Sequence, residues 1–121
     1  MRVQGRRIPV TTWCALAAAV SILLNACRSA PALTGQELAG KHLYDGRCAH
    51  CHEDNDLQLK KVPPDLHRLF DQSMLPSGVP ADDVEVKRVV LAGRGMMPAF
   101  TDRFNDEQMA ALLAYLHTGL R

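Results

Sequence analysis

The amino-acid sequence predicts an all-α domain with about three main helices and short turns between them. Two stretches, Thr34-x-x-Glu37 and Asn105-x-x-Gln108, fit a capping box, in which paired side chains satisfy free backbone N–H groups at the start of a helix. Two groups of apolar residues have the spacing of one helix face: Val86, Val89 and Val90, and Met109, Leu112, Leu113 and Leu116. The helix starts and the apolar faces together favour the helical class.

The first predicted helix covers residues 35 to about 46. Gly40, Tyr44 and Cys48 recur every four residues, so they share one face of it. A glycine in the middle of a helix costs about 1 kcal/mol relative to alanine. We therefore expect another helix to approach closely at Gly40.

The two later helices have their own boundary signals. Asp82 and Asp83 favour a helix start, because their charges oppose the positive end of the helix dipole. Gly93 is expected to end that helix as a left-handed cap. The last helix starts at Asn105, and Gly119 is expected to stop it.

The stretch Cys48-Ala49-His50-Cys51-His52 has the pattern C-x-x-C-H, the attachment signature of a c-type haem. Two thiols three residues apart lie on the same side of one helical turn, so both can add to the vinyl groups along one porphyrin edge. His52 follows directly and can place its imidazole under the iron as proximal ligand. A zinc site would need a second ligand pair, and the chain has no cysteine after Cys51.

A methionine loop, residues 94–100, separates the last two predicted helices. A thioether is a soft ligand suited to haem iron, and pairing it with histidine raises the reduction potential. Pro98 restricts Met97 to extended backbone geometry, which would hold the sulfur steady. A methionine in a small protein is usually core filler. The C-x-x-C-H motif elsewhere in the same domain is what favours Met97 as the distal ligand.

The N-terminal residues have the composition of an export signal. A positive region is followed by an apolar run, residues 14–26, that is short for a membrane span. The next residue completes the stretch Leu24-Asn25-Ala26-Cys27, which resembles a bacterial lipoprotein box. We expect a signal peptide over residues 1–26, a lipidated Cys27 with a tether over residues 27–33, and a domain over residues 34–121. Such a protein would lie at the periplasmic face of a bacterial membrane.

Two alternatives for the N-terminal region stay open. The first is ordinary cleavage after the weak small-x-small site at residues 30–32, which would give a soluble periplasmic protein. The second is an uncleaved anchor formed by residues 8–27, which carry no charge. The chain of 121 residues is one domain's worth, and its formal net charge of +1 gives no indication of a nucleic-acid partner.

Four motifs, in this order along the chain, resemble those of class I cytochromes c in their small bacterial monohaem form. The first runs from Gly40 to the C-x-x-C-H motif, and the second is residues 64–70, which open with Pro64 twelve residues after the haem histidine. The third is the methionine loop and the fourth is the last helix with Tyr115. The resemblance covers residues 34–121. It implies a cytochrome c fold, with about three main helices plus short turns wrapped around one covalent haem.

The resemblance also implies roles for single residues in holding the haem. Cys48 and Cys51 would bind it covalently, while His52 and Met97 would be its proximal and distal iron ligands. The carbonyl group of Pro64 would accept a hydrogen bond from the proximal histidine.

Three further expectations concern packing and the remaining cationic and imidazole groups. The first and last helices would cross near Gly40 and Tyr115. Arg94 is a candidate anchor for a haem propionate. The other histidines are expected to lie away from the iron, and they are His42, His50, His67 and His117.

The predicted function is one-electron transfer, because a haem with two axial ligands has no open position for a substrate. The chain is therefore expected to be a carrier and not an enzyme, with redox proteins as partners: a dehydrogenase, a quinol-oxidising complex or a terminal oxidase or reductase. We expect neither a nucleic-acid partner nor a small-molecule substrate. One alternative is a gas sensor or minor peroxidase, if the Met97 bond is labile. Another is a thiol–disulfide or zinc protein, which would need free Cys48 and Cys51.

Overall fold

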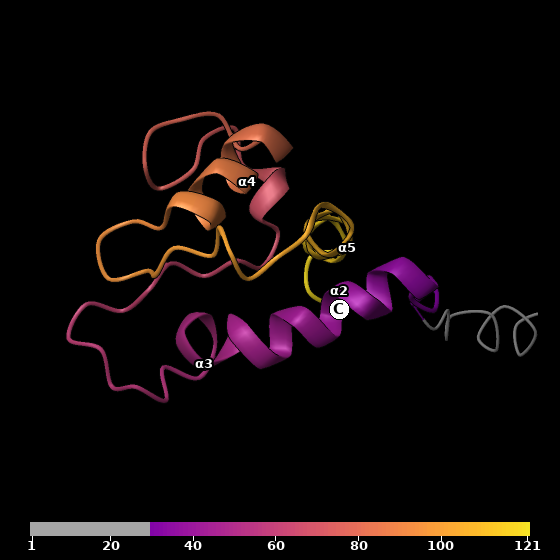
Figure 1. Cartoon of the computed structure of the whole chain (residues 1–121), viewed down its shortest axis with the longest axis horizontal. Coiled ribbons are helices and arrows are strands. Elements are labelled where there is room, and N and C mark those ends of the chain that lie inside the picture. The colour runs from indigo at the N-terminus through magenta and orange to yellow at the C-terminus, as the bar shows by residue number, and fades with distance from the viewer. Residues whose placement is uncertain (1–29) are drawn as a thin grey trace, which may run out of the picture. The chain divides into compact units, whose positions relative to one another are not determined.

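The computed structural model describes residues 30–121, and their folded part is helical (Figure 1). The prediction of an all-α class is confirmed, since no strand forms within the described residues and just two isolated bridges occur there. Residues Leu33–Arg121 form one compact unit. Its elements, in chain order, are α2 (Gly35–Arg47), α3 (Ala49–His52), the 3-10 turn η1 (Leu69–Asp71), α4 (Asp83–Ala92) and α5 (Asp106–His117).

Both predicted capping boxes are present. At the start of α2, the Thr34 hydroxyl accepts a hydrogen bond from the Glu37 N–H at 3.2 Å, and the Glu37 carboxylate accepts one from the Thr34 N–H at 2.6 Å. These hydrogen bonds hold the pKa of Glu37 below its ordinary value. At the start of α5, Asn105 and Gln108 make the same reciprocal pair, at 2.8 and 3.1 Å. The local sequence therefore fixes where the two longest helices begin.

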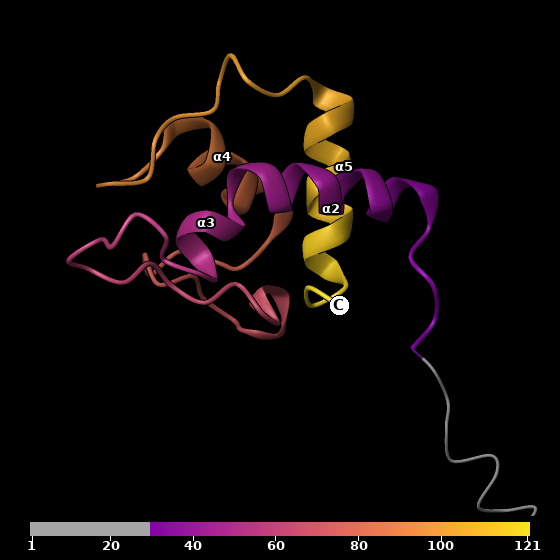
Figure 2. The same cartoon turned by 90° about the horizontal axis from the view of Figure 1, so that it is seen from below.

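Helices α2 and α5 cross each other at Gly40 (Figure 2). A Cβ atom built on Gly40 would lie 2.0 Å from the Ala111 carbonyl oxygen and 2.8 Å from the Tyr115 Cβ. One helical turn later, the ring of Tyr44 packs edge-on against that of Tyr115, with centroids 5.6 Å apart. The expected close approach at Gly40 and Tyr115 is confirmed, because no side chain fits at the crossing.

The core is built mostly by α5, which buries a broad apolar face. Its buried side chains are Met109, Ala111, Leu112, Leu113, Tyr115 and Leu116. Helix α2 contributes Tyr44 to the same cluster, and α4 contributes Val86 and Val90. No polar or charged residue among the described residues is buried. Apolar burial is therefore the main stabilising contribution to this small unit.

The C-terminal end of helix α4 differs from the predicted one. Its start is as predicted, with the Asp82 carboxylate accepting a hydrogen bond from the Glu85 N–H at 2.9 Å. At its other end, Gly93 has φ 71° but ψ 172°, so it is not the predicted left-handed helical cap. The reason is that the chain leaves the helix in an extended direction toward the methionine loop.

The C-terminal end of α5 is joined to the start of α4 by a side-chain pair. His117 Nε2 lies 2.7 Å from an Asp83 carboxylate oxygen, and the imidazole ring stacks on Phe70 with centroids 3.7 Å apart. The side chain of His117 is half exposed, and its contacts with Asp83 and Phe70 join α5 to α4 and η1. Both members of the pair face solvent, so the ion pair itself contributes little.

The predictions for the N-terminal region are not addressed by the fold. The expected signal peptide and Cys27 lie outside the described residues. Within residues 30–121, no helix has the length and apolar character needed to cross a membrane.

We predict that Gly40→Ala destabilises the protein, because its Cβ would overlap the backbone of Ala111. Overpacking of this kind costs roughly 1–3 kcal/mol. The matched control is Gly46→Ala in the same helix, where an added Cβ meets nothing within 4 Å. That control should be neutral or stabilising by up to about 1 kcal/mol. Urea denaturation of both variants measures the difference, and equal midpoints would contradict the crossing.

Candidate functional site

The C-x-x-C-H motif lies where α2 ends and the single turn of α3 begins. Cys48 is the C-cap of α2 and the N-cap of α3, and its carbonyl accepts from the N–H groups of Cys51 and His52 at 3.1 and 2.9 Å. Both thiols are free and half-buried. Burial raises the pKa of Cys48 to about 11, so at neutral pH it is a protonated thiol. Two free thiols at three-residue spacing on one helical turn are placed to form thioether bonds along one edge of a porphyrin.

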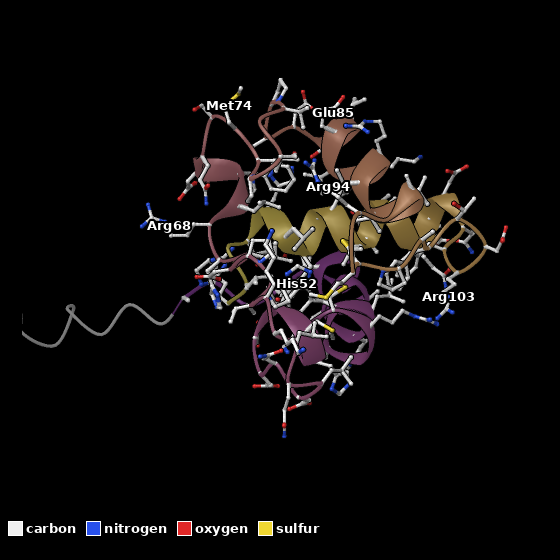
Figure 3. All side chains as sticks on the ribbon, turned by 90° about the vertical axis from the view of Figure 1, so that its left-hand side faces the viewer. His52, Arg68, Met74, Glu85, Arg94 and Arg103 are labelled. Atoms are coloured by element: carbon white, nitrogen blue, oxygen red, sulfur yellow. The ribbon has the colours of Figure 1, made fainter. Side chains whose placement is uncertain are left out.

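The imidazole of His52 is oriented by a backbone carbonyl. Its Nδ1 donates a hydrogen bond to the Pro64 oxygen at 2.8 Å. A carbonyl oxygen can only accept, so the proton sits on Nδ1 and the lone pair of Nε2 is left free for a metal. Such an outer hydrogen bond fixes the ring of a metal-binding histidine and raises its basicity. In Figure 3, His52 lies near the middle of the face shown.

Pro64 is followed by a tight turn that fixes the chain beside it. One carboxylate oxygen of Asp65 lies 2.8 Å from both the backbone nitrogen and the ring Nδ1 of His67. The hydrogen bond from the His67 N–H is the main cause of the lowered pKa of Asp65. The turn gives the neighbouring Pro64 carbonyl a fixed direction toward His52.

The methionine loop is a tight hairpin turn. The Arg94 N–H donates to the Met97 oxygen at 3.0 Å, and the Met97 N–H donates to the Arg94 oxygen at 2.9 Å. Gly95, at the first central position, has φ 58°, as a two-residue hairpin turn requires. Met96 is 57% exposed at the tip, whereas Met97 is half-buried and packs against the core cluster. The two methionines are thus distinguished by burial, with Met97 on the inner side.

Cys48 and Met97 both pack against the same buried cluster, although they come from distant parts of the chain. The structure thus brings the cysteine side and the methionine side of the predicted site to one core. The donor set fits a covalent haem: two free thiols at three-residue spacing, one imidazole with its tautomer fixed, and one half-buried thioether. In contrast, no group of three or more His, Cys, Asp or Glu side chains among residues 30–121 could hold a metal ion.

The remaining imidazoles have other partners or face solvent. His50 and His67 each lie within 2.9 Å of an aspartate carboxylate, as His117 does. His42 is exposed on α2. Arg94 is also exposed, and its side chain makes no ion pair with another described residue.

One buried polar atom beside the motif was not foreseen from the sequence. The Tyr44 hydroxyl is buried and finds no hydrogen-bond partner among the described residues. Burial, with the nearby Glu53 carboxylate as a further cause, raises the pKa of Tyr44. The i, i+4 spacing of Tyr44 and Cys48 was the available signal that this hydroxyl lies next to the site.

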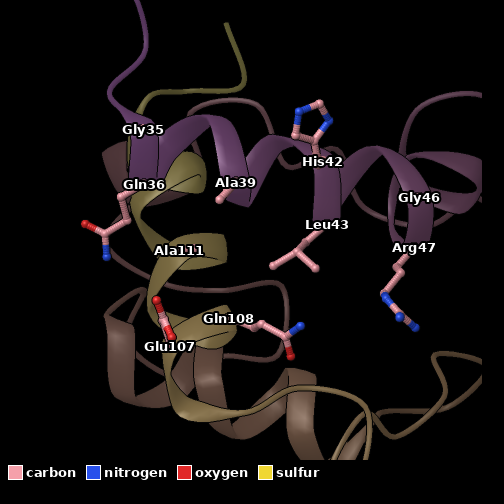
Figure 4. A pocket seen from close by; sticks show the side chains of 10 residues that line it. All are labelled: Gly35, Gln36, Ala39, His42, Leu43, Gly46, Arg47, Glu107, Gln108 and Ala111. Atoms are coloured by element: carbon pink, nitrogen blue, oxygen red, sulfur yellow. The ribbon is translucent and has the colours of Figure 1, made fainter.

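A groove on the surface of the domain is a separate feature. It is an open groove between α2 and α5, with Ala39, Leu43 and Arg47 on one side and Gln108 and Ala111 on the other (Figure 4). It contains none of the predicted haem ligands, so it is not the haem site.

Comparison with known proteins places the chain among cytochromes. Residues 35–116 match the family model described as cytochrome C oxidase, cbb3-type, subunit III. The chain is 31% identical to chloroplastic cytochrome c6 of Chlamydomonas reinhardtii over 111 residues, which is 89% of this chain and 69% of the relative. It is 29% identical to cytochrome c6 of Chlorolobion braunii over 80 residues, 64% of this chain and 84% of the relative. No solved structure matches significantly.

We predict that Asp65→Ala loosens the carbonyl that orients His52. Without the carboxylate, the turn after Pro64 loses its hydrogen bonds to His67, so the His52 Nδ1 proton should exchange with solvent several-fold faster. NMR of the reduced protein measures this exchange. Because the pKa of Asp65 is lowered in the fold, its contribution is complete above the ordinary value of 3.8 and is lost as the pH falls through the lower folded value. An exchange rate equal to that of the unchanged protein would contradict the role of this turn.

Proposed function

Because this chain belongs to the cytochrome c family, whose members carry electrons on covalent haem, we propose that it is a carrier with His52 and Met97 as axial iron ligands. The protein transfers electrons through one c-type haem and exchanges them with other redox proteins. When bound, the haem supplies a reversible one-electron change at iron. The chain's own residues attach it and orient its ligands.

The hydrogen bond between His52 and Pro64 carries this proposal. It leaves Nε2 as the one ring nitrogen able to bind a metal, and it holds the ring in a fixed orientation. The half-buried thiols of Cys48 and Cys51, in the turn that leads into His52, are the points of covalent attachment. Their three-residue spacing and the absence of a disulfide between them support that assignment.

Met97 is proposed as the second ligand on two grounds. It is the inner of the two loop methionines, and its backbone is closed into a hairpin with Arg94. Two axial ligands leave no position for a substrate, which favours electron transfer over catalysis. Arg94 is retained as a candidate anchor for a propionate, because it is an exposed cation at the start of the methionine loop with no ion pair among the described residues.

The competing function, a gas sensor or minor peroxidase, requires a weak bond between Met97 and iron. Binding of carbon monoxide to the reduced protein at neutral pH would distinguish this function from electron transfer. The hairpin of the methionine loop holds the backbone of Met97 in place, which favours a firm bond to iron and therefore an electron carrier.

For the partners, we propose a dehydrogenase, a quinol-oxidising complex or a terminal oxidase or reductase. For location, we propose export, with residues 1–26 removed and Cys27 lipidated at the periplasmic face of a bacterial membrane. A flexible tether of about seven residues has an end-to-end distance of about 15 Å. Such a short tether would keep the domain at a high effective concentration near membrane-bound or surface partners.

We predict that Met97→Ala abolishes the sulfur-to-iron charge-transfer band, lowers the reduction potential and admits carbon monoxide. The reason is that removal of the thioether opens one axial position. The matched control is Met96→Ala, which should keep the band because Met96 lies at the exposed tip. Absorption spectroscopy and a redox titration measure both. Loss of the band in the control alone would move the assignment to Met96.

We predict that Cys27→Ala releases the protein from membranes into the soluble periplasmic fraction. Lipidation gives more than the two anchoring signals that stable attachment needs, and the substitution removes all of them. Cell fractionation with haem staining compares the two forms. If the unchanged protein is itself soluble, it diffuses freely and has no lipid anchor.

A further inference from the structure

The carboxyl end of α4 lies directly against the backbone of the methionine loop. A Cβ atom built on Gly93 would lie 2.7 Å from the Met97 oxygen, 2.8 Å from the Pro98 carbonyl carbon and 2.7 Å from the Ala99 nitrogen. All three are backbone atoms, so none can rotate away. The space between the end of α4 and the chain on either side of Pro98 is therefore just wide enough for a glycine.

The conformation of Gly93 gives the same result independently of its contacts. Its φ of 71° and ψ of 172° lie in a region that is essentially restricted to glycine. Its N–H still donates to the Val89 oxygen at 2.9 Å, so the residue remains attached to the helix. Gly93 thus joins the rigid end of α4 to the loop without a side chain between them.

The far end of the loop is held by the same helix. The Phe100 N–H donates to the oxygens of Val90 and Leu91 at 3.2 and 3.1 Å, and the Thr101 hydroxyl donates to the Leu91 oxygen at 2.8 Å. These are carbonyls of the last helical turn, which have no partner within a helix. The residues between Gly93 and Thr101 are therefore clamped to the end of α4 on both sides of Met97.

We infer that Gly93 is a positioning residue, which fixes the distance of the Met97 sulfur from the haem iron. The inference rests on the proposed role of Met97 as ligand. A larger residue at 93 displaces the Met97–Pro98 peptide bond and thereby weakens the sulfur–iron bond.

The test uses the complete oxidised haem protein and imidazole, which competes with the methionine for iron. Gly93→Ala should weaken the charge-transfer band and bind imidazole at least about tenfold more tightly than the unchanged protein. The matched control is Gly78→Ala, which also has a positive φ, 81°, but where an added Cβ meets nothing within 4 Å. Its imidazole affinity should stay within about twofold of the unchanged protein.

The outcomes separate a positioning role from a structural one. A Gly93→Ala protein with a lower denaturation midpoint but an unchanged band and imidazole affinity overturns the inference. Met97→Ala distinguishes this failure from failure of the proposed function: if that variant keeps the band, Met97 is not the ligand and both fall. If Gly93→Ala does not fold, Thr101→Val decides, since it removes one hydroxyl hydrogen bond of the clamp. It should tighten imidazole binding about threefold, and an unchanged affinity again overturns the inference.

Discussion

Gly40 of α2 packs directly against the backbone of α5, and the placement of the haem-binding turn follows from this contact. The two helices approach so closely that a Cβ atom on Gly40 would overlap the carbonyl oxygen of Ala111. One turn further along α2, Tyr44 packs on Tyr115, and one turn beyond that stands Cys48. The crossing therefore sets the position from which the haem-binding turn leaves the core. Gly40 is thus unfavourable for the helix itself, but it allows the close packing of α2 on α5 and thereby places the site.

The two sides of the proposed haem site, that of His52 and that of Met97, are held by different kinds of contact. On the histidine side, the supports are close in sequence: α3 is a single turn, and the Pro64 carbonyl that orients His52 lies twelve residues away. On the methionine side, the loop is short and has no helix of its own, so α4 supplies the rigidity through Gly93 and the hydrogen bonds to Phe100. The inner position of Met97 is therefore a property of the packing of α4, although the residue lies outside that helix.

The sequence predicts the parts of the fold that local chemistry determines. Capping boxes depend on residues three apart, and both were placed correctly; the crossing at Gly40 followed from one glycine in a helical pattern and from a family resemblance. The ψ angle of Gly93 could not be predicted, because it depends on where Met97 and Pro98 return in space. For the same reason the sequence did not reveal the pair of His117 with Asp83, whose members are 34 residues apart. The C-x-x-C-H motif and the nearby Pro64 predict the histidine side of the site, whereas the way α4 holds Met97 depends on a chain path that the sequence pattern does not contain.

These supports have a common character, since they are mostly uncharged. His52 is held by a backbone carbonyl, and the methionine loop is held by backbone hydrogen bonds, one hydroxyl and a glycine contact. In contrast, every ion pair among residues 30–121 has both side chains at least 25% exposed. Exposed charges are screened by salt, whereas close packing and backbone hydrogen bonds are not. Ionic strength should therefore act on the encounter with a redox partner and leave the proposed iron ligands, His52 and Met97, in place. For an electron carrier this separation is useful, because a change of partner or of medium alters the rate of encounter without altering the packing around the proposed ligands.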